Sequence, residues 1–267
     1  MARLLGTVVL VTLLVSLVAC SPEKGSKSTD EGSGQSTTAE PSGATTAPEG
    51  ETTATDVAAT WDYVALGDSL AAGVGADRGY VERYADHVRD DTGARVRVVN
   101  LGVSGQTSGE LLRTLREDPS VREELRRAEV ITLNIGINDL GHAGEAYENG
   151  TCGGSDGEEC LRAAVEEVEA NWDAIVAEIS KLRSTDTSIV RTAGLGYVPR
   201  VGGVYEPYLD EVNRHIVTTA EKNGIPHAEI QLGDGDMSPD GVHPNDDGYA
   251  VIARELRGLG YAPSSSR

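Results

Sequence analysis

Aromatic residues are scarce in this chain of 267 residues. It contains no phenylalanine and only 2 tryptophans and 9 tyrosines. A hydrophobic core must therefore be built mainly from valine, leucine, isoleucine and alanine. Proteins that bind single-stranded nucleic acid stack the bases on aromatic side chains, so this scarcity argues against such a function.

Basic residues are also few. The 23 lysines and arginines face 43 acidic residues, which gives a net charge of -20. A balance of this sign repels phosphate backbones and anionic lipid surfaces, so we expect no nucleic-acid partner. Proline and glycine number 10 and 32, an ordinary share that excludes a collagen-like or wholly disordered chain.

Cysteine is rare as well, because the chain has only three. Three thiols are too few for a disulfide-framework miniprotein, and they do not form a zinc-type cluster. The acidic loop at residues 234–240 is a poor calcium site, since it has Pro239 where an EF-hand loop needs glycine. We expect no metal and no cofactor.

The first 20 residues have the pattern of an export signal. Arg3 precedes an uncharged, mostly apolar run at residues 4–19. This run is shorter than the ~20 residues that a membrane-spanning helix needs. It ends in Leu-Val-Ala-Cys at 17–20, which resembles the lipobox of bacterial lipoproteins and implies a lipid anchor on Cys20. A plain secretory signal with an accidental cysteine is the alternative.

The next segment, residues 20–60, is dominated by small and polar residues and contains no leucine, isoleucine or aromatic residue before position 61. It cannot bury enough apolar surface to offset the entropy of ordering. As a flexible coil it would span roughly 35 Å. We therefore predict a signal peptide at 1–19, a disordered tether at 20–60 and one folded domain at 61–267.

Strand and helix patterns alternate along the folded part. Short apolar runs predict buried strands at 61–66, 95–101, 130–135, 188–193 and 227–232. Helical periodicity predicts helices at 79–90, 107–127 in two pieces, 161–182, 206–222 and 246–257. This alternation is typical of a parallel sheet between helices, in which ligands bind outside the carboxyl ends of the strands.

Four polar motifs follow predicted strands, at the positions where chemistry is expected. They are Gly-Asp-Ser-Leu at 67–70, Ser-Gly-Gln-Thr at 104–107, Gly-Ile-Asn-Asp at 136–139 and Asp-Gly-Val-His at 240–243. Each motif alone is weak, but all four in this order give the chain a strong resemblance to the GDSL esterase/lipase family, also called SGNH hydrolases. The resemblance covers residues 61–260. It implies a flavodoxin-like three-layer α/β/α sandwich with a five-stranded parallel sheet.

A serine hydroxyl is a weak nucleophile and needs a neighbouring base that a third group orients. Asp240 and His243 lie three residues apart, so the carboxylate can reach Nδ1 of the imidazole while Nε2 faces Ser69. We therefore predict Ser69, His243 and Asp240 as the catalytic residues.

A tetrahedral intermediate also needs hydrogen-bond donors for its oxyanion. Candidates are the backbone N–H groups of Ser69 and Gly105 and the side-chain amide of Asn138, which the resemblance assigns to the oxyanion hole. Gly105 is preferred to Gly102 because it lies in the stretch that opens the next helix, and because the lack of a Cβ eases close approach.

Each of these residues also has an ordinary structural interpretation. Asp68 and Asp139 can be helix caps, Asn138 a turn residue, and Asp240 part of a common turn. The four motifs together favour catalysis. His142 follows Asn138 closely enough to be a candidate for lining the site, whereas the remaining histidines fit surface or packing positions.

Cys152 and Cys160 fall in a glycine-rich, acidic insertion. In an exported protein a disulfide between them is the default expectation, and a reduced pair or a soft-metal site is the alternative.

These features predict a membrane-tethered, extracytoplasmic serine esterase, monomeric, acting on a small-molecule or polysaccharide ester. The insertion at 141–159 is too polar to wrap a long acyl chain, which favours short acyl groups. A carbohydrate O-acetylesterase, a lysophospholipase or a thioesterase is the alternative within enzymes. A binding lipoprotein that kept the fold is the non-enzymatic alternative.

Overall fold

The centre of the fold is a parallel sheet. In the computed structural model, which describes residues 59–195 and 203–263, five strands pair in the order β2-β1-β3-β4-β5. Their bounds are β1 (Thr60–Gly67), β2 (Arg95–Asn100), β3 (Val130–Asn134), β4 (Ile189–Ala193) and β5 (His227–Ala228). The predicted five-stranded sandwich is confirmed. The predicted signal peptide, nearly all of the tether and Cys20 lie outside the described residues.

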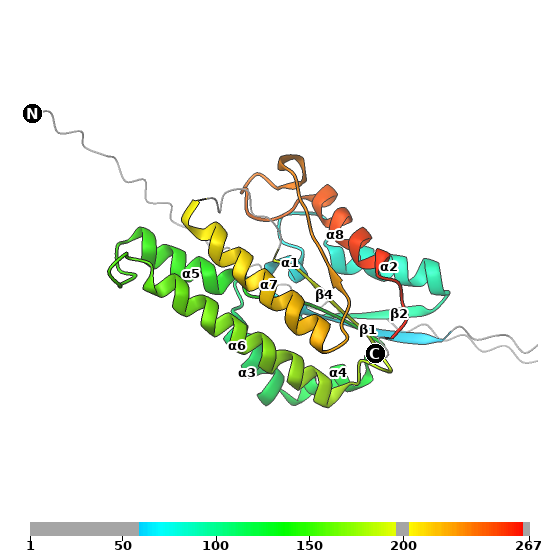
Figure 1. The fold of residues 1–267 in the computed structure, drawn as a ribbon. Coiled ribbons are helices and arrows are strands. Elements are labelled where there is room, and N and C mark those ends of the chain that lie inside the picture. The colour runs from blue at the N-terminus through cyan, green and yellow to red at the C-terminus, as the bar shows by residue number, and fades with distance from the viewer. Residues whose placement is uncertain (1–58, 196–202, 264–267) are drawn as a thin grey trace, which may run out of the picture. The chain divides into compact units, whose positions relative to one another are not determined.

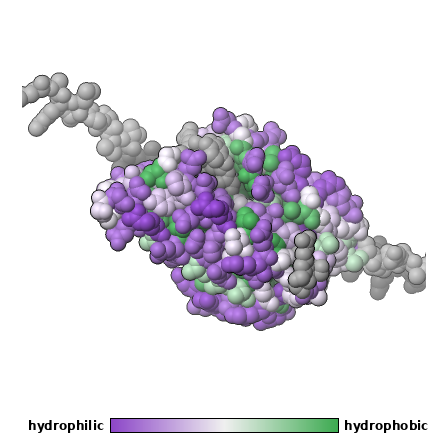
Figure 2. Space-filling model, in the orientation of Figure 1, coloured by the Kyte–Doolittle hydropathy of each residue, from purple (hydrophilic) through white to green (hydrophobic). Residues whose placement is uncertain are grey.

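Helices cover both faces of this sheet (Figure 1). One face carries α1 (Ser69–Ala72), α2 (Tyr80–Thr92) and α8 (Asp246–Gly258). The other carries α3 (Ser108–Glu117), α4 (Pro119–Arg127), α5 (Ile137–Glu148), α6 (Glu159–Leu182) and α7 (Glu206–Lys222). Short 3-10 turns lie at Gly203–Tyr205 and Asp234–Asp236. The face of the molecule in Figure 2 is mostly hydrophilic, with hydrophobic residues in small separate patches.

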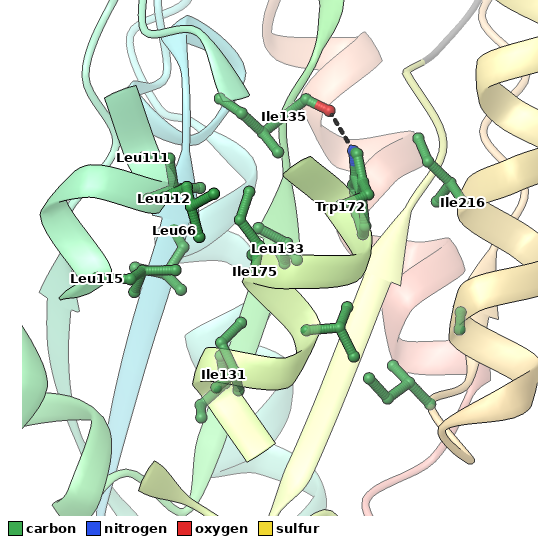
Figure 3. Packing of buried hydrophobic residues seen from close by; sticks show 14 of the residues in the cluster. Leu66, Leu111, Leu112, Leu115, Ile131, Leu133, Ile135, Trp172, Ile175 and Ile216 are labelled. Carbon is green, nitrogen blue, oxygen red and sulfur yellow. Dashed lines mark hydrogen bonds between the residues drawn. The ribbon is translucent and has the colours of Figure 1, made fainter. Parts of the chain in front are cut away.

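The core on the α6 side is aliphatic around one tryptophan. Trp172 on α6 is fully buried, and its indole N–H donates to the carbonyl oxygen of Ile135 at 2.9 Å (Figure 3). This bond satisfies the only polar atom of the indole ring, as a buried tryptophan requires. Trp172 thereby fixes α6 against the carboxyl end of β3, where the candidate site begins.

The core on the α2 and α8 side contains most of the buried aromatic surface. Four tyrosines, Tyr63, Tyr80, Tyr84 and Tyr249, are buried there among alanine and valine side chains. The Tyr249 hydroxyl donates to the carbonyl oxygen of Val74 at 2.7 Å, and Tyr63 shares a hydrogen bond with a threonine of β3. The expectation of a core built mainly from valine, leucine, isoleucine and alanine is confirmed, and tyrosine supplies the large rings on this face.

Two elements differ from the sequence prediction. The fifth strand was predicted over 227–232 but ends at Ala228, because its partner Ala193 is the last residue of β4 and nothing remains to pair with. The helix α5 was not predicted, since Gly141 and Gly144 lower helix propensity within it. Gly144 is there for packing: a Cβ on it would lie 2.9 Å from the ring of Tyr205.

No helix in the described ranges is long and apolar enough to cross a bilayer.

Candidate active site

The candidate nucleophile stands at a sharp turn between β1 and α1. Ser69 is the first residue of α1, directly after the strand. Gly67 makes the turn possible, because its φ is +152° and a Cβ on it would lie 2.4 Å from the carbonyl oxygen of Asn134. Asp68 caps α1 by accepting a hydrogen bond from the N–H of Leu70 at 3.0 Å. Strand, turn and cap together fix Ser69 at the carboxyl edge of the sheet.

Ser69, His243 and Asp240 form a continuous chain of hydrogen bonds. The imidazole Nε2 of His243 lies 2.9 Å from Ser69 Oγ, and Nδ1 lies 2.7 Å from Asp240 Oδ2. The bond to His243, more than any other interaction, holds the pKa of the Asp240 carboxyl well below its usual range. An ionised carboxylate can only accept, so Nδ1 carries the proton and Nε2 is free to accept from the serine. The arrangement can therefore generate a nucleophilic serine.

The loop that carries Asp240 is tightly braced. Asp240 Oδ1 accepts from the backbone N–H groups of Val242 and His243, at 2.8 and 2.9 Å, and from the hydroxyl of Ser238 at 2.8 Å. Ser238 was not predicted. Nothing in the sequence singles it out, because serine is a common residue and this contact exists only in the folded chain.

Three residues of the cleft, including Ser69 itself, have an N–H group that is available to a bound ligand. In the described part of the chain, the N–H groups of Ser69 and Gly105 donate to no protein acceptor. The amide of Asn138 donates one N–H to the carbonyl oxygen of Gln106 at 2.9 Å, which leaves its second N–H available. All three predicted donors line the same cleft as the Ser69 hydroxyl. They are the kind of group that stabilises a tetrahedral oxyanion.

The two candidate glycines of this loop have different roles. Gly102 packs against α1, where a Cβ would lie 2.5 Å from the backbone nitrogen of Ala72. Gly105 faces open space but has a φ of +80°, a conformation that favours glycine. The backbone angle is therefore a requirement for glycine at position 105, and the expectation that the missing Cβ eases close approach of an oxyanion stays a prediction.

A buried carboxylate, Asp68, and a half-buried one, Asp139, flank the site. Burial raises the pKa of Asp68 to about 6, and its Oδ2 has no hydrogen-bond partner among the described residues. Asp139 accepts from both the N–H and the hydroxyl of Ser108, at 2.9 and 2.7 Å, and burial raises its pKa as well. Asp68 does act as a helix cap, while Asp139 caps the neighbouring α3 and not its own helix.

A cleft of about 490 Å³ opens in front of Ser69. Part of its wall is apolar and comes from Ile137, Leu140 and Leu195. Farther along α5 it includes Glu145 and Glu148, which follow Asn138 by seven and ten residues, or about 10 and 15 Å of helix. His142 is exposed and is not among the residues that line the cleft, so this candidate is not brought to the site.

Cys152 and Cys160 are joined in a disulfide that closes the loop between α5 and α6. Cys152 packs with Ala143 of α5 and Leu161 of α6, behind the wall of the cleft. Within the described ranges, no group of three or more histidine, cysteine or acidic side chains is arranged to hold a metal ion.

Comparison with known proteins decides the family. Residues 65–251 match the model of the GDSL-like lipase/acylhydrolase family. The chain belongs to this family. Among curated proteins it is 28% identical over 220 residues to the spore germination lipase LipC of Bacillus licheniformis, covering 76% of this chain and 97% of that one. It is 29% identical over 217 residues to YpmR, an uncharacterized protein of Bacillus subtilis, covering 72% of this chain and 78% of YpmR.

Solved structures of GDSL-type and related hydrolases share the fold. The lipase Lip_vut3 from a goat rumen metagenome superposes with a TM-score of 0.68 at 27% identity, covering 77% of this chain and 100% of that one. The acetylxylan esterase Axe2 of Geobacillus stearothermophilus gives a TM-score of 0.58 at 21% identity, covering 79% and 99%. The protein is a carboxylic ester hydrolase.

Proposed function

We propose that this GDSL-family enzyme hydrolyses short-chain carboxylic esters, with Ser69 as nucleophile and His243 as general base. The observation that carries the proposal is the unbroken hydrogen-bonded chain Ser69–His243–Asp240 at the mouth of a cleft. Its members come from opposite ends of the folded domain, so chance proximity is a poor explanation.

In the first half-reaction, Ser69 Oγ bonds to the ester carbonyl carbon while its proton passes to Nε2 of His243. The carbonyl oxygen becomes an oxyanion and accepts hydrogen bonds from the N–H groups of Ser69 and Gly105 and from Asn138. The bond to the alcohol oxygen then breaks, and the imidazolium gives that oxygen its proton. Asp240 stabilises the imidazolium and remains a carboxylate throughout.

In the second half-reaction, water attacks the acyl group on Ser69. His243 takes a proton from the water and returns it to Ser69 Oγ as the acid leaves. One turn of the cycle consumes one ester and one water, releases an alcohol and an acid, and uses side chains and backbone N–H groups of this chain.

The wall of the cleft supports a short acyl group and a neutral or hydroxylated substrate. The apolar section beside Ser69 extends only as far as Gly144, and the carboxylates of Glu145 and Glu148 lie beyond it. A long alkyl chain would have to lie against these carboxylates and displace water from them, which disfavours its binding. The net charge of -20 also disfavours approach to anionic lipid.

A carbohydrate O-acetyl ester is the second candidate substrate. Tyr205 and Tyr208 line the outer part of the cleft, and the hydroxyl of Tyr205 donates to Glu148 at 3.1 Å. Tyrosine rings beside carboxylates offer a stacking surface and acceptors for sugar hydroxyls. The acetylxylan esterases among the structural neighbours agree with this choice.

We also propose that the enzyme is exported and held at the membrane by lipid on Cys20. The support is the lipobox-like Leu-Val-Ala-Cys that ends the apolar run. The substitution Cys20→Ser should release the protein from the membrane fraction and abolish labelling by a fatty-acid analogue. Labelling that persists in the variant would refute the anchor.

The proposed nucleophile is tested with a fluorophosphonate probe. Wild-type protein should be labelled covalently on Ser69, and Ser69→Ala should lose both labelling and ester hydrolysis while keeping its circular dichroism spectrum. A folded wild-type protein that is neither labelled nor active on any ester would favour the binding-lipoprotein alternative.

A further inference from the structure

Two segments that carry oxyanion donors are joined by a pair of contacts. Asn138 and Asp139 are neighbours in the first turn of α5, and each bonds to the segment at residues 105–108. Asn138 donates to the carbonyl oxygen of Gln106, while Asp139 accepts from the N–H and hydroxyl of Ser108. Gly105, the other candidate donor, lies at the start of that segment.

The carboxylate contact is the stronger of the two. Bonds to a carboxylate are shorter and roughly twice as strong as bonds between neutral groups. Ser108 is fully buried, and its hydroxyl also accepts from the amide of Asn171 on α6 at 2.9 Å. Asp139 therefore anchors the start of α3 to the start of α5, and the same serine links both to the middle of α6.

The bond from Asn138 to Gln106, which joins two neutral groups, is not reinforced by the Gln106 side chain. Gln106 is buried, and its side-chain Oε1 has no hydrogen-bond partner among the described residues. Its side chain therefore contributes packing but no bond that would hold the segment. Without Asp139, the bond from Asn138 to the Gln106 carbonyl would be the only hydrogen bond that joins residues 105–108 to α5 within the described ranges.

We propose that Asp139 is a positioning residue, which holds residues 105–108 against α5 and so sets the separation between the Gly105 N–H and the Asn138 amide. It does not touch the substrate. The proposal rests on the proposed assignment of Ser69 and its oxyanion donors. Misplacement of a catalytic group by about 1 Å costs on the order of 10²-fold in rate, so this anchor should matter for turnover.

The test compares three variants with a matched control. Asp139→Ala should lower kcat by about 10²-fold and leave KM within about threefold, because the donors act on the transition state and not on the bound ester. Asp139→Asn should keep most of the wild-type activity, since an amide can accept from the Ser108 N–H and donate to the Ser108 hydroxyl oxygen. Ser108→Ala removes one of the two bonds and should give an intermediate loss of about tenfold.

Asp118→Ala is the control, because Asp118 makes the same pair of bonds to Ser120 at the start of α4, at 2.8 and 2.6 Å. It should lower the melting temperature and leave kcat unchanged. Inhibition by a short alkylboronic acid supplies the second measurement. Ser69 Oγ bonds to the boron while its proton passes to His243, so the adduct carries an oxyanion-like oxygen. Its Ki should rise in Asp139→Ala by the same factor as kcat falls.

Several results would overturn the positioning role. They are an Asp139→Ala variant with kcat within threefold of wild type, an unchanged boronate Ki, or a loss that appears in KM alone. If Asp139→Ala does not fold, the decision rests on Asp139→Asn and Ser108→Ala, and a Ser108→Ala kcat equal to wild type overturns the role. An active wild-type enzyme that is unlabelled at Ser69 would instead refute the proposed catalytic assignment.

Discussion

Asn138 Nδ2 donates to the carbonyl oxygen of Gln106 at 2.9 Å, across 32 positions of sequence. The bond fixes one hydrogen of the amide, so the other has a defined direction. An asparagine that could rotate freely would have to be ordered during the reaction, and this contact makes that ordering unnecessary.

Asn138→Ala should lower kcat by about 10²–10³-fold, the usual effect of losing one oxyanion donor. Asn138→Asp should lower kcat at least as much, because a carboxylate cannot donate a hydrogen bond and repels the oxyanion. Steady-state kinetics on a nitrophenyl acetate measures both variants. An Asn138→Ala enzyme within fivefold of wild type would exclude this residue from the oxyanion hole.

His243→Ala should lower kcat more than Asn138→Ala does, because it removes the base on which Ser69 depends. Asp240→Asn should lower kcat by roughly 10²–10⁴-fold, since an amide that donates to Nδ1 leaves the proton on Nε2 and blocks the serine bond. Ser238→Ala, which removes only one of the bonds to Asp240, is the milder companion variant. Near-wild-type turnover by His243→Ala would contradict the triad assignment.

The value of kcat/KM on nitrophenyl esters should peak between C2 and C6. The reason is the short apolar section of the cleft, which ends at the carboxylates of Glu145 and Glu148. A series from C2 to C16 measures the profile, with Ser69→Ala as the control for background hydrolysis. A steady rise to C12 or C16, or activation at a lipid interface, would contradict the prediction.

Loss of the disulfide should destabilise the domain. The two cysteines are separated by 8 positions, and closing so short a loop is worth about 2–3 kcal/mol in the chain-entropy model. Cys152→Ser with Cys160→Ser should therefore lower the melting temperature by roughly 5–10 °C, as should a reductant on the wild type. Cys20→Ser is the matched control and should melt like wild type. An unchanged melting temperature in the double variant would show that the loop contributes nothing to stability.

Asp68 should make the domain less stable as pH rises. Its folded-state pKa of about 6 lies above the ordinary value of 3.8, so the folded protein binds the proton more tightly than the unfolded chain. Below about pH 4 the carboxyl is protonated in both states and does not lower the free energy of unfolding. The free energy of unfolding then falls as pH rises, and the loss levels off above about pH 6 at on the order of 3 kcal/mol. Urea unfolding of wild type and Asp68→Asn from pH 4 to 7.5 should show the variant gaining relative stability over this range. A difference that is constant with pH would refute the assignment.

Much of the fold was predictable because periodicity depends on local burial. The runs at 61–66 and 130–135 were nearly correct, since both strands lie between two layers of helices and their buried stretches are mostly apolar. The α5 helix was missed because its glycines serve a contact with Tyr205, which is distant in sequence. The last strand was overestimated because its end depends on where β4 stops.

For the site, residue types and order predicted which side chains meet, but not what holds them. The four motifs identify Ser69, Asn138, Asp240 and His243, because parallel strands bring their carboxyl ends to one edge. Braces such as Ser238 and Ser108 are common residues whose roles depend on contacts made only in the folded chain. The positive φ of Gly105 is likewise a property of backbone geometry, which composition does not reveal.

Ser69 and His243 meet across 174 positions of sequence. During synthesis the serine therefore emerges from the ribosome long before its base, and a partial chain that stops before residue 243 lacks the base. Besides its internal bonds, the base loop is fastened to α8, through Asn245 at the start of that helix and through the bond from Arg83 on α2 to Asp246 at 2.5 Å. We therefore expect ester hydrolysis to appear only after α8 has been made and has docked.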